Sequence, residues 1–228
     1  MSPFTQTASK AMAPIYTKHG AVPQIQFPLE VLTNAGIEEI LILVSPSHGY
    51  QIMEYLGDGK NFGCNITYKT QDMNREITGI AQALGMAKEF TGDDDFIMIL
   101  GDNYFDKYIL EESMHLDDFV DSDFTFVAKE VDNATAFGVM NWDTGRIVEK
   151  PSLPPSNWAI TGLYKYSSKV YDAVSSIEPS QRNELEITDV NNYMLENHKW
   201  FHILLGPNHH WQDMGTPKSS YELSKRLL

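Results

Sequence analysis

Short apolar runs alternate with amphipathic segments through the first half of the chain, and this alternation limits the fold more than any other feature. The runs at 38–45 (EEILILVS), 65–69 (NITYK) and 95–100 (DFIMIL) predict strands, and the segments at 50–56 and 79–90 predict helices. A strand, a helix and a further strand in succession imply parallel pairing with right-handed crossovers. Because two of the three runs are almost continuously apolar, we expect strands covered on both faces at the centre of an open α/β sheet.

The second half of the chain has a different pattern, in which strand-like segments follow one another closely. This spacing predicts an antiparallel or mixed patch added to the first sheet. A helix is expected before the patch, and a helix, a strand and a last helix after it. Thr188 or Asp189 could cap the first of the later helices, and Pro217 suits the first turn of the last one. The expected strands lie at 123–129, 137–143, 145–150, 158–168 and 199–206, and the expected helices at 108–120, at 188–198 and from 217 onward.

The chain shows no linker, repeat or low-complexity tract that would divide it. We therefore expect residues 1–228 to form a single domain with a mixed, mostly parallel sheet flanked by helices. A chain of this length can bury well over half of its unfolded surface, so a real core is available.

The charge balance excludes several classes of partner. The chain carries 17 Lys and Arg against 31 Asp and Glu, a formal net charge of -14, so its average field repels nucleic acids and anionic membrane surfaces. No run approaches the roughly 18 apolar residues of a membrane helix. Cys64 is the single cysteine, so the chain cannot form an intramolecular disulfide, and this composition fits a reducing compartment. We expect a cytoplasmic protein with neither a nucleic-acid nor a membrane partner.

Two carboxylates stand at positions suited to a divalent cation. Asp102 follows the buried run at 95–100, where open α/β sheets gather ligands, and Asp213 lies between a strand and the last helix. Mg²⁺ favours such hard oxygen ligands and keeps water and substrate phosphate in its shell. The alternatives are a turn aspartate at Asp102 and a loop or cap residue at Asp213. The adjacent His209 and His210 have no third ligand at a spacing typical of zinc sites.

Two lysines and a glycine could meet a phosphate in this acidic chain. Lys10 and Lys150 lie in short polar turns where an ammonium group could point at a phosphate, although a solvated surface lysine is the default interpretation. Gly79 stands just ahead of an expected helix, where backbone N–H groups could face a nucleobase edge or a phosphate. The alternative for Gly79 is a simple helix entry.

Ordered blocks along the whole chain resemble one family. TASKAMAPIY, TGIAQAL, ILGDNYF, VEKP, RNELEITDVNNYML and WQDMGT occur in the order and approximate spacing of the glucose-1-phosphate thymidylyltransferases. GDN, ELEITD and W-x-D-x-G-T are typical of this branch of the sugar nucleotidyltransferases. A set of ordered blocks is far more specific than any single motif.

The resemblance implies a Rossmann-like nucleotidyltransferase fold and a Mg²⁺-dependent reaction of dTTP, or UTP, with glucose 1-phosphate, in a chain that forms a homo-oligomer. It implies that Asp102 and Asp213 hold the Mg²⁺, that Lys10 meets the nucleotide phosphates and that Lys150 binds the sugar phosphate. The residues that it places at the base and deoxyribose are Gln71, Gly79 and Gln82, and those in the hexose pocket are Gly138, Glu149, Thr161 and Tyr164.

One family feature has no counterpart in this chain. The family begins with a strand and a loop of the form G-G-x-G-T-R-L, and Met1 aligns just after its arginine. By the strand order usual for such sheets, we expect a central strand and a phosphate loop to be missing, with a cost in stability and catalysis. The alternative function is therefore a non-catalytic sugar-nucleotide-binding or assembly protein. Neither G-x-S-x-G nor G-x-G-x-x-G occurs, which disfavours a hydrolase or a dehydrogenase.

Overall fold

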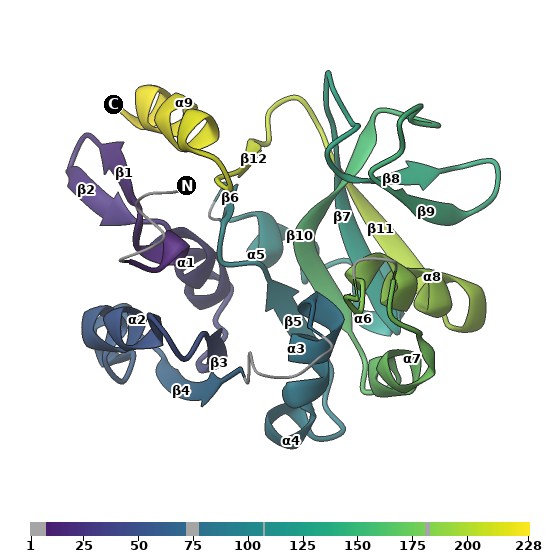
Figure 1. The fold of residues 1–228 in the computed structure, drawn as a ribbon, viewed down its shortest axis with the longest axis horizontal. Coiled ribbons are helices and arrows are strands. Elements are labelled where there is room, and N and C mark those ends of the chain that lie inside the picture. The colour runs from purple at the N-terminus through teal and green to yellow at the C-terminus, as the bar shows by residue number, and fades with distance from the viewer. Residues whose placement is uncertain (1–7, 72–77, 107, 181–182) are drawn as a thin grey trace. The chain divides into compact units, whose positions relative to one another are not determined.

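The computed structural model describes residues 8–71, 78–106, 108–180 and 183–228, and it is an α/β protein (Figure 1). The chain divides into two compact units. Unit 1 contains residues 1–72, 99–114 and 209–228, and unit 2 contains residues 73–98 and 115–208. The expected loop before Lys10 and part of the segment after Gln71 lie outside the described residues. The prediction of one domain stays a prediction.

The described residues of unit 1 form three short pairs of strands, accompanied by helices. Strands β3 (Glu39–Val44) and β4 (Asn65–Thr70) run parallel, whereas β1 (Pro14–Thr17) with β2 (Gly20–Pro23), and β6 (Asn103–Phe105) with β12 (Trp211–Asp213), are antiparallel. The helices of unit 1 are η2 (Lys10–Met12), α1 (Gln26–Asn34), α2 (Gly49–Leu56), η3 (Lys60–Phe62), α5 (Ile109–Ser113) and α9 (Pro217–Leu227).

Helix α9, from the last residues of the chain, packs against β1, from the first strand pair of unit 1. Thr216 caps it by accepting a hydrogen bond from the Ser219 backbone, and Pro217 occupies the first turn, as the sequence predicts. The amide of Tyr16 in β1 donates to Ser224 Oγ at 3.0 Å, and Leu223 packs in a small buried cluster with Ile15 and Met214. Figure 1 shows α9 in yellow beside the purple β1. This packing fixes the short loop between α9 and β12, the strand that ends at Asp213.

Unit 2 contains a larger mixed sheet with the order β11-β7-β10-β8-β9, and β5 also pairs with β10. Pairing is parallel between β11 and β7 and antiparallel along β7, β10, β8 and β9. Phe124, Tyr166 and Met194 lie in its fully buried core. The strands are β5 (Phe96–Ile99), β7 (Phe124–Glu130), β8 (Gly138–Asn141), β9 (Arg146–Glu149), β10 (Trp158–Tyr166) and β11 (Trp200–Leu205), and the helices are α3 (Ile80–Met86), α4 (Lys88–Thr91), α6 (Asp117–Asp121), α7 (Val170–Ser176) and α8 (Ile187–Asn197).

The predicted α/β class, the mixed sheet and the antiparallel patch in the second half are confirmed. Antiparallel pairing is more extensive among the described strands than a mostly parallel sheet implies, because the patch makes up most of the sheet in unit 2. The expected central position of two strands is wrong for the described ladders, where β3 pairs with β4 and β5 with β10. An apolar run reports coverage of a strand's faces and not pairing at both of its edges.

Two local predictions need correction. The helix expected at 108–120 is divided into α5 and α6, which are separated by the residues around His115. The residue that caps α8 is Glu186, without a side-chain cap bond, rather than Thr188 or Asp189. Because α8 begins at Ile187, Thr188 lies inside its first turn, and its hydroxyl donates to Glu149 Oε2 at 2.5 Å. None of the described helices has the length and apolar character that crossing a bilayer requires.

Candidate functional site

Lys10 and Asp102, 92 residues apart in sequence, form an ion pair in unit 1. Lys10 lies in η2 and Asp102 in the turn between β5 and β6, and Lys10 Nζ donates to Asp102 Oδ2 at 2.6 Å. The two side chains are 37% and 30% exposed, so solvent screens the pair and its contribution to stability is about 0–1 kcal/mol. Because a ligand can replace such a weak partner at low cost, both charges are open to exchange.

The pairing of β6 with β12 brings Asp213 to the same place. Asn103 stands opposite Asp213 in this ladder, and the amide of Met214 donates to the carbonyl of Asp102 at 2.7 Å. The backbone of Asp213 therefore lies beside that of Asp102, and both belong to unit 1. The Asp213 carboxylate also accepts a hydrogen bond from the Gly215 amide.

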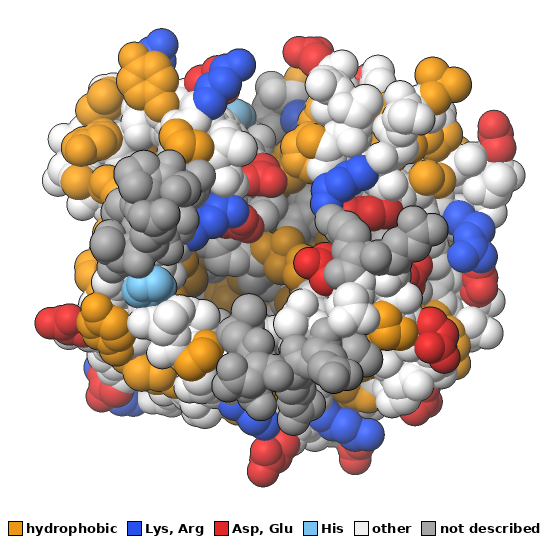
Figure 2. Space-filling view, viewed as in Figure 1, with side chains coloured by type: hydrophobic (Ala, Val, Ile, Leu, Met, Phe, Trp, Pro, Cys, Tyr) orange, Lys and Arg blue, Asp and Glu red, His pale blue; other side chains and the backbone are white. Residues whose placement is uncertain are grey.

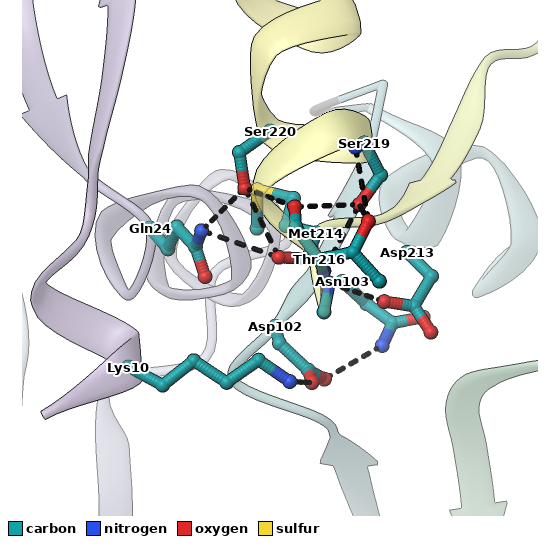
Figure 3. Close-up of polar contacts among 10 residues, drawn as sticks. Lys10, Gln24, Asp102, Asn103, Asp213, Met214, Thr216, Ser219 and Ser220 are labelled. Carbon is teal, nitrogen blue, oxygen red and sulfur yellow. Dashed lines mark hydrogen bonds and ion pairs between the residues drawn. The ribbon is translucent and has the colours of Figure 1, made fainter. Parts of the chain in front are cut away.

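Gly215 stands where these side chains converge. A Cβ atom on this glycine would lie 2.5 Å from Asp213 Oδ1 and 3.1 Å from Lys10 Nζ. Both functional atoms thus border the small space that the missing side chain leaves. We call Lys10, Asp102, Asp213 and Gly215 the carboxylate cluster (Figure 3).

The donor set of the carboxylate cluster fits Mg²⁺ better than Zn²⁺. It offers two carboxylates and no sulfur or imidazole, and Mg²⁺ is typically held by one or two carboxylates with water and substrate phosphate completing its shell. In the part of the chain that the structure describes, no group of three or more His, Cys, Asp or Glu is placed to hold a metal ion. An ion at this cluster would therefore need oxygen atoms from water and from a ligand.

Unit 2 holds a second polar group, which we call the Glu149 cluster: Gly138, Glu149, Lys150 and Thr188. Lys150 Nζ lies 3.0 Å from Glu149 Oε1, and Thr188 Oγ1 donates to Glu149 Oε2. A Cβ on Gly138 would lie 3.4 Å from Glu149 Oε2 and 3.5 Å from Thr188 Oγ1. Lys150 has a positive φ of 41°, a conformation that non-glycine residues seldom adopt. The structure thus brings three of the predicted sugar-site residues together.

Two other predicted sugar-site residues use their side chains inside unit 2. Thr161 is 1% exposed, and its hydroxyl donates to the Val127 carbonyl at 2.8 Å. Tyr164 is also buried, and burial raises the pKa of its hydroxyl. Both side chains therefore belong to the buried interior of unit 2, on β10.

The three residues predicted to face the base are divided between the two units. Gly79 and Gln82 lie at the start of α3 in unit 2, whereas Gln71 follows β4 in unit 1. Gly79 has φ +121°, and a Cβ there would meet the Leu185 backbone, including its nitrogen at 2.9 Å. Glycine is therefore required at this position by its neighbour in unit 2, which supports the helix-entry alternative for Gly79.

Comparison with known proteins agrees with this geometry. The family model described as Nucleotidyl transferase matches residues 1–228. A glucose-1-phosphate thymidylyltransferase of Neisseria meningitidis is 36% identical over 96% of this chain and 75% of its own length.

The chain belongs to the nucleotidyl transferase family. A Bacillus anthracis structure assigned as a glucose-1-phosphate thymidylyltransferase superposes with a TM-score of 0.87 at 32% identity, over 100% of this chain and 89% of that one. The low-salt glycan biosynthesis nucleotidyltransferase Agl11 of Haloferax volcanii is 36% identical to this chain, and the match spans 100% of this chain and 62% of Agl11. The predicted resemblance and fold are confirmed, and the chain is a nucleotidyltransferase.

Three residues of this nucleotidyl transferase were missed by reasoning from the sequence. Asn103 and Trp211 are joined by a hydrogen bond beside the carboxylate cluster, and Gln24, which is fully buried, donates to Met214 O at 3.3 Å and to Ser220 Oγ at 2.9 Å. Figure 3 shows Gln24 pointing at the loop after Asp213. A glutamine between apolar residues was the only available sequence signal, and it does not reveal a partner 190 residues away.

Proposed function

We propose that this nucleotidyl transferase carries out Mg²⁺-dependent transfer of a thymidylyl group from dTTP to glucose 1-phosphate, giving dTDP-glucose and pyrophosphate. The convergence of Lys10, Asp102 and Asp213 around Gly215 is the observation that carries the proposal. The names of the relatives suggest the substrates, since the thymidylyltransferases are named for glucose 1-phosphate and the thymidylyl group.

In this reaction a phosphate oxygen of glucose 1-phosphate attacks the α-phosphorus of dTTP in line. A new P–O bond forms as the bond from the α-phosphorus to the bridging oxygen breaks, and that oxygen leaves with pyrophosphate. Asp102 and Asp213 would hold the Mg²⁺, which neutralises charge on the phosphates. Lys10 would exchange its bond to Asp102 for one to a phosphate oxygen. No covalent enzyme intermediate is needed, because positioning and charge neutralisation supply the catalysis.

The Glu149 cluster suits the sugar phosphate. Lys150 would meet its phosphate group, and Glu149 would accept hydrogen bonds from hexose hydroxyls. Gly138 would leave room for the ring, while Thr161 and Tyr164 would support the strand below. Gln71, Gly79 and Gln82 are proposed at the base and deoxyribose. The distribution of charge favours local recognition, because on the face shown in Figure 2 basic side chains are scattered among acidic ones.

The nucleotide base, the location and the assembly belong to the proposal as well. We favour dTTP over UTP because of the relatives named as thymidylyltransferases, and a cytoplasmic homo-oligomer stays a prediction. A pocket's shape decides between two such similar bases, so the two nucleotides must be compared directly.

Pyrophosphate release tests the proposal. The purified chain is incubated with glucose 1-phosphate, Mg²⁺ and either dTTP or UTP, and pyrophosphate is measured by a coupled assay. We expect turnover of about 1–1,000 per second with dTTP, which is the usual range for enzymes, and slower turnover with UTP. A parallel calorimetric titration with dTDP-glucose identifies the alternative: product binding without pyrophosphate release would contradict the enzyme and favour a binding protein.

A further inference from the structure

A chain of hydrogen bonds leads from a buried tryptophan to one of the proposed metal-binding carboxylates. Trp211 Nε1 donates to Asn103 Oδ1 at 2.7 Å, and Asn103 Nδ2 donates to Asp102 Oδ1 at 3.1 Å. The other oxygen of Asp102 accepts the bond from Lys10. Trp211 and Asn103 are 8% and 3% exposed, so solvent has little access to the hydrogen bond between them.

The chemistry of the indole group fixes which group donates and which accepts in each of these hydrogen bonds. An indole N–H can only donate, so the group of Asn103 that faces it must be the amide oxygen. The NH₂ group of Asn103 then faces Asp102, where it can donate to the carboxylate. The reverse orientation of the amide would set an N–H against an N–H at Trp211 and an oxygen against an oxygen at Asp102. Trp211 thus selects the orientation of Asn103.

The strand pairing holds the three residues in register. Trp211 stands opposite Phe105 and Asp213 opposite Asn103 in the antiparallel ladder of β6 and β12. Asp102 directly precedes Asn103, and its carbonyl accepts from the Met214 amide. The same two strands therefore fix both the backbone of Asp102 and the donor to its side chain.

We propose that Trp211 and Asn103 are positioning residues, which hold the Asp102 carboxylate by Oδ1 and present Oδ2 to a cation. Lys10 is the cation in this structure, and a divalent metal ion takes that place when it binds. The identity of the metal in turnover rests on the proposed function. Partners that orient a metal ligand in this way typically change metal affinity by about 10–100-fold when they are removed.

Metal affinity provides a test that does not depend on turnover. Mn²⁺, a paramagnetic substitute for Mg²⁺, is titrated into the full chain, and the free ion is measured by electron paramagnetic resonance. Trp211→Phe keeps an aromatic ring and removes the N–H, and we expect it to weaken Mn²⁺ binding about tenfold. Trp142→Phe, which changes an exposed tryptophan of unit 2, is the matched control and should leave the affinity unchanged.

A double-mutant cycle separates positioning from packing. If Trp211 acts through Asn103, then Trp211→Phe, Asn103→Leu and the double variant should each weaken Mn²⁺ binding about tenfold, whereas independent effects would multiply to about a hundredfold. Asn103→Ala replaces Asn103→Leu if the latter fails to fold, and circular dichroism checks each melting temperature.

The possible outcomes separate this proposal from the proposed function. Unchanged Mn²⁺ affinity in folded Trp211→Phe, multiplied effects in the double variant, or no Mn²⁺ binding by the unsubstituted chain would overturn the positioning role. Coupled losses of affinity in a chain that releases no pyrophosphate would support the positioning role while contradicting the proposed function.

Discussion

The carboxylate cluster of unit 1 and the Glu149 cluster of unit 2 differ in their charge balance. The first sets two carboxylates, Asp102 and Asp213, against one ammonium group, that of Lys10, and so carries an excess negative charge. The second sets Glu149 against Lys150 and adds the hydroxyl of Thr188. A further cation would be stabilised by the first cluster, whereas a ligand rich in hydroxyl groups suits the second.

The two clusters also differ in how they are fixed. In unit 1, partly exposed charges are held by buried neutral side chains such as Asn103, and the ladder of β6 and β12 sets their spacing. In unit 2, the cluster is fixed by a bond between α8 and the end of β9. We propose on this basis that unit 1 provides charge neutralisation and unit 2 provides recognition, and the following substitutions test this division.

Asp102→Asn should have the largest effect. It keeps the shape of the side chain and removes the charge that a metal ion and Lys10 would share, so kcat/KM for pyrophosphate release should fall about 10³-fold, or about 4 kcal/mol. Asp58→Asn, which changes an exposed carboxylate outside the cluster, should leave kcat/KM for pyrophosphate release close to that of the unsubstituted chain. Near-normal turnover by Asp102→Asn would refute the metal assignment.

Two glycine substitutions compare the clusters directly. Gly215→Ala brings a Cβ to 2.5 Å from Asp213 Oδ1, so this carboxylate must move, and kcat should fall about 10–100-fold. Gly138→Ala meets its nearest atom, Ile147 Cγ2, at 3.2 Å, and should raise KM for glucose 1-phosphate less than tenfold. Steady-state kinetics with each substrate varied would check both effects. Equal effects on kcat would remove the proposed division of labour.

Thr188→Val should have a smaller and more selective effect. It removes the hydrogen bond to Glu149 Oε2 at nearly constant volume, so Glu149 loses one constraint on its position. We expect KM for glucose 1-phosphate to rise about two- to tenfold, with KM for dTTP unchanged. Thr33→Val, on α1 of unit 1, is the control. An increase confined to dTTP would contradict a sugar-site role for the Glu149 cluster.

His202→Phe should change only the pH dependence of stability. Burial lowers the pKa of His202, so the folded state favours the neutral ring. The contribution of the neutral His202 ring to the stability of the folded state is fully present above the unfolded pKa of about 6.5. It is lost as the pH falls below that value toward the folded pKa. The melting temperature of the variant should therefore decline less between about pH 7.5 and about pH 5. An equal or steeper decline would contradict this account.

The sequence predicted most of the elements and the neighbourhood of the carboxylates. Apolar runs mark β3 and β5, although most of their residues are only partly buried, and Asp102 follows such a run after Gly101. The β1–β2 hairpin was missed because its four-residue strands carry no clear alternation. The bond from Trp211 to Asn103 was missed because it depends on the pairing of two three-residue strands 108 positions apart.

The cap of α8 was predicted wrongly because the helix begins at Ile187, one residue before the expected start. Thr188 has the residue type of a helix cap, and local preference alone would give it that role. In the structure Thr188 lies inside the first turn, and its hydroxyl donates to the Glu149 carboxylate, 39 positions away in sequence. A local pattern cannot register such a distant acceptor, whereas family resemblance brought Glu149 forward as a site residue.

Mn²⁺ binding in the presence of dTTP tests most directly the claim that the carboxylate cluster is a metal centre for the nucleotide. Electron paramagnetic resonance would compare the unsubstituted chain with the Asp102→Asn/Asp213→Asn double variant, after circular dichroism shows that both are folded. A metal centre at this cluster predicts one tightly bound Mn²⁺ per chain with dTTP and its loss in the double variant. Equal Mn²⁺ binding by the two proteins would contradict it.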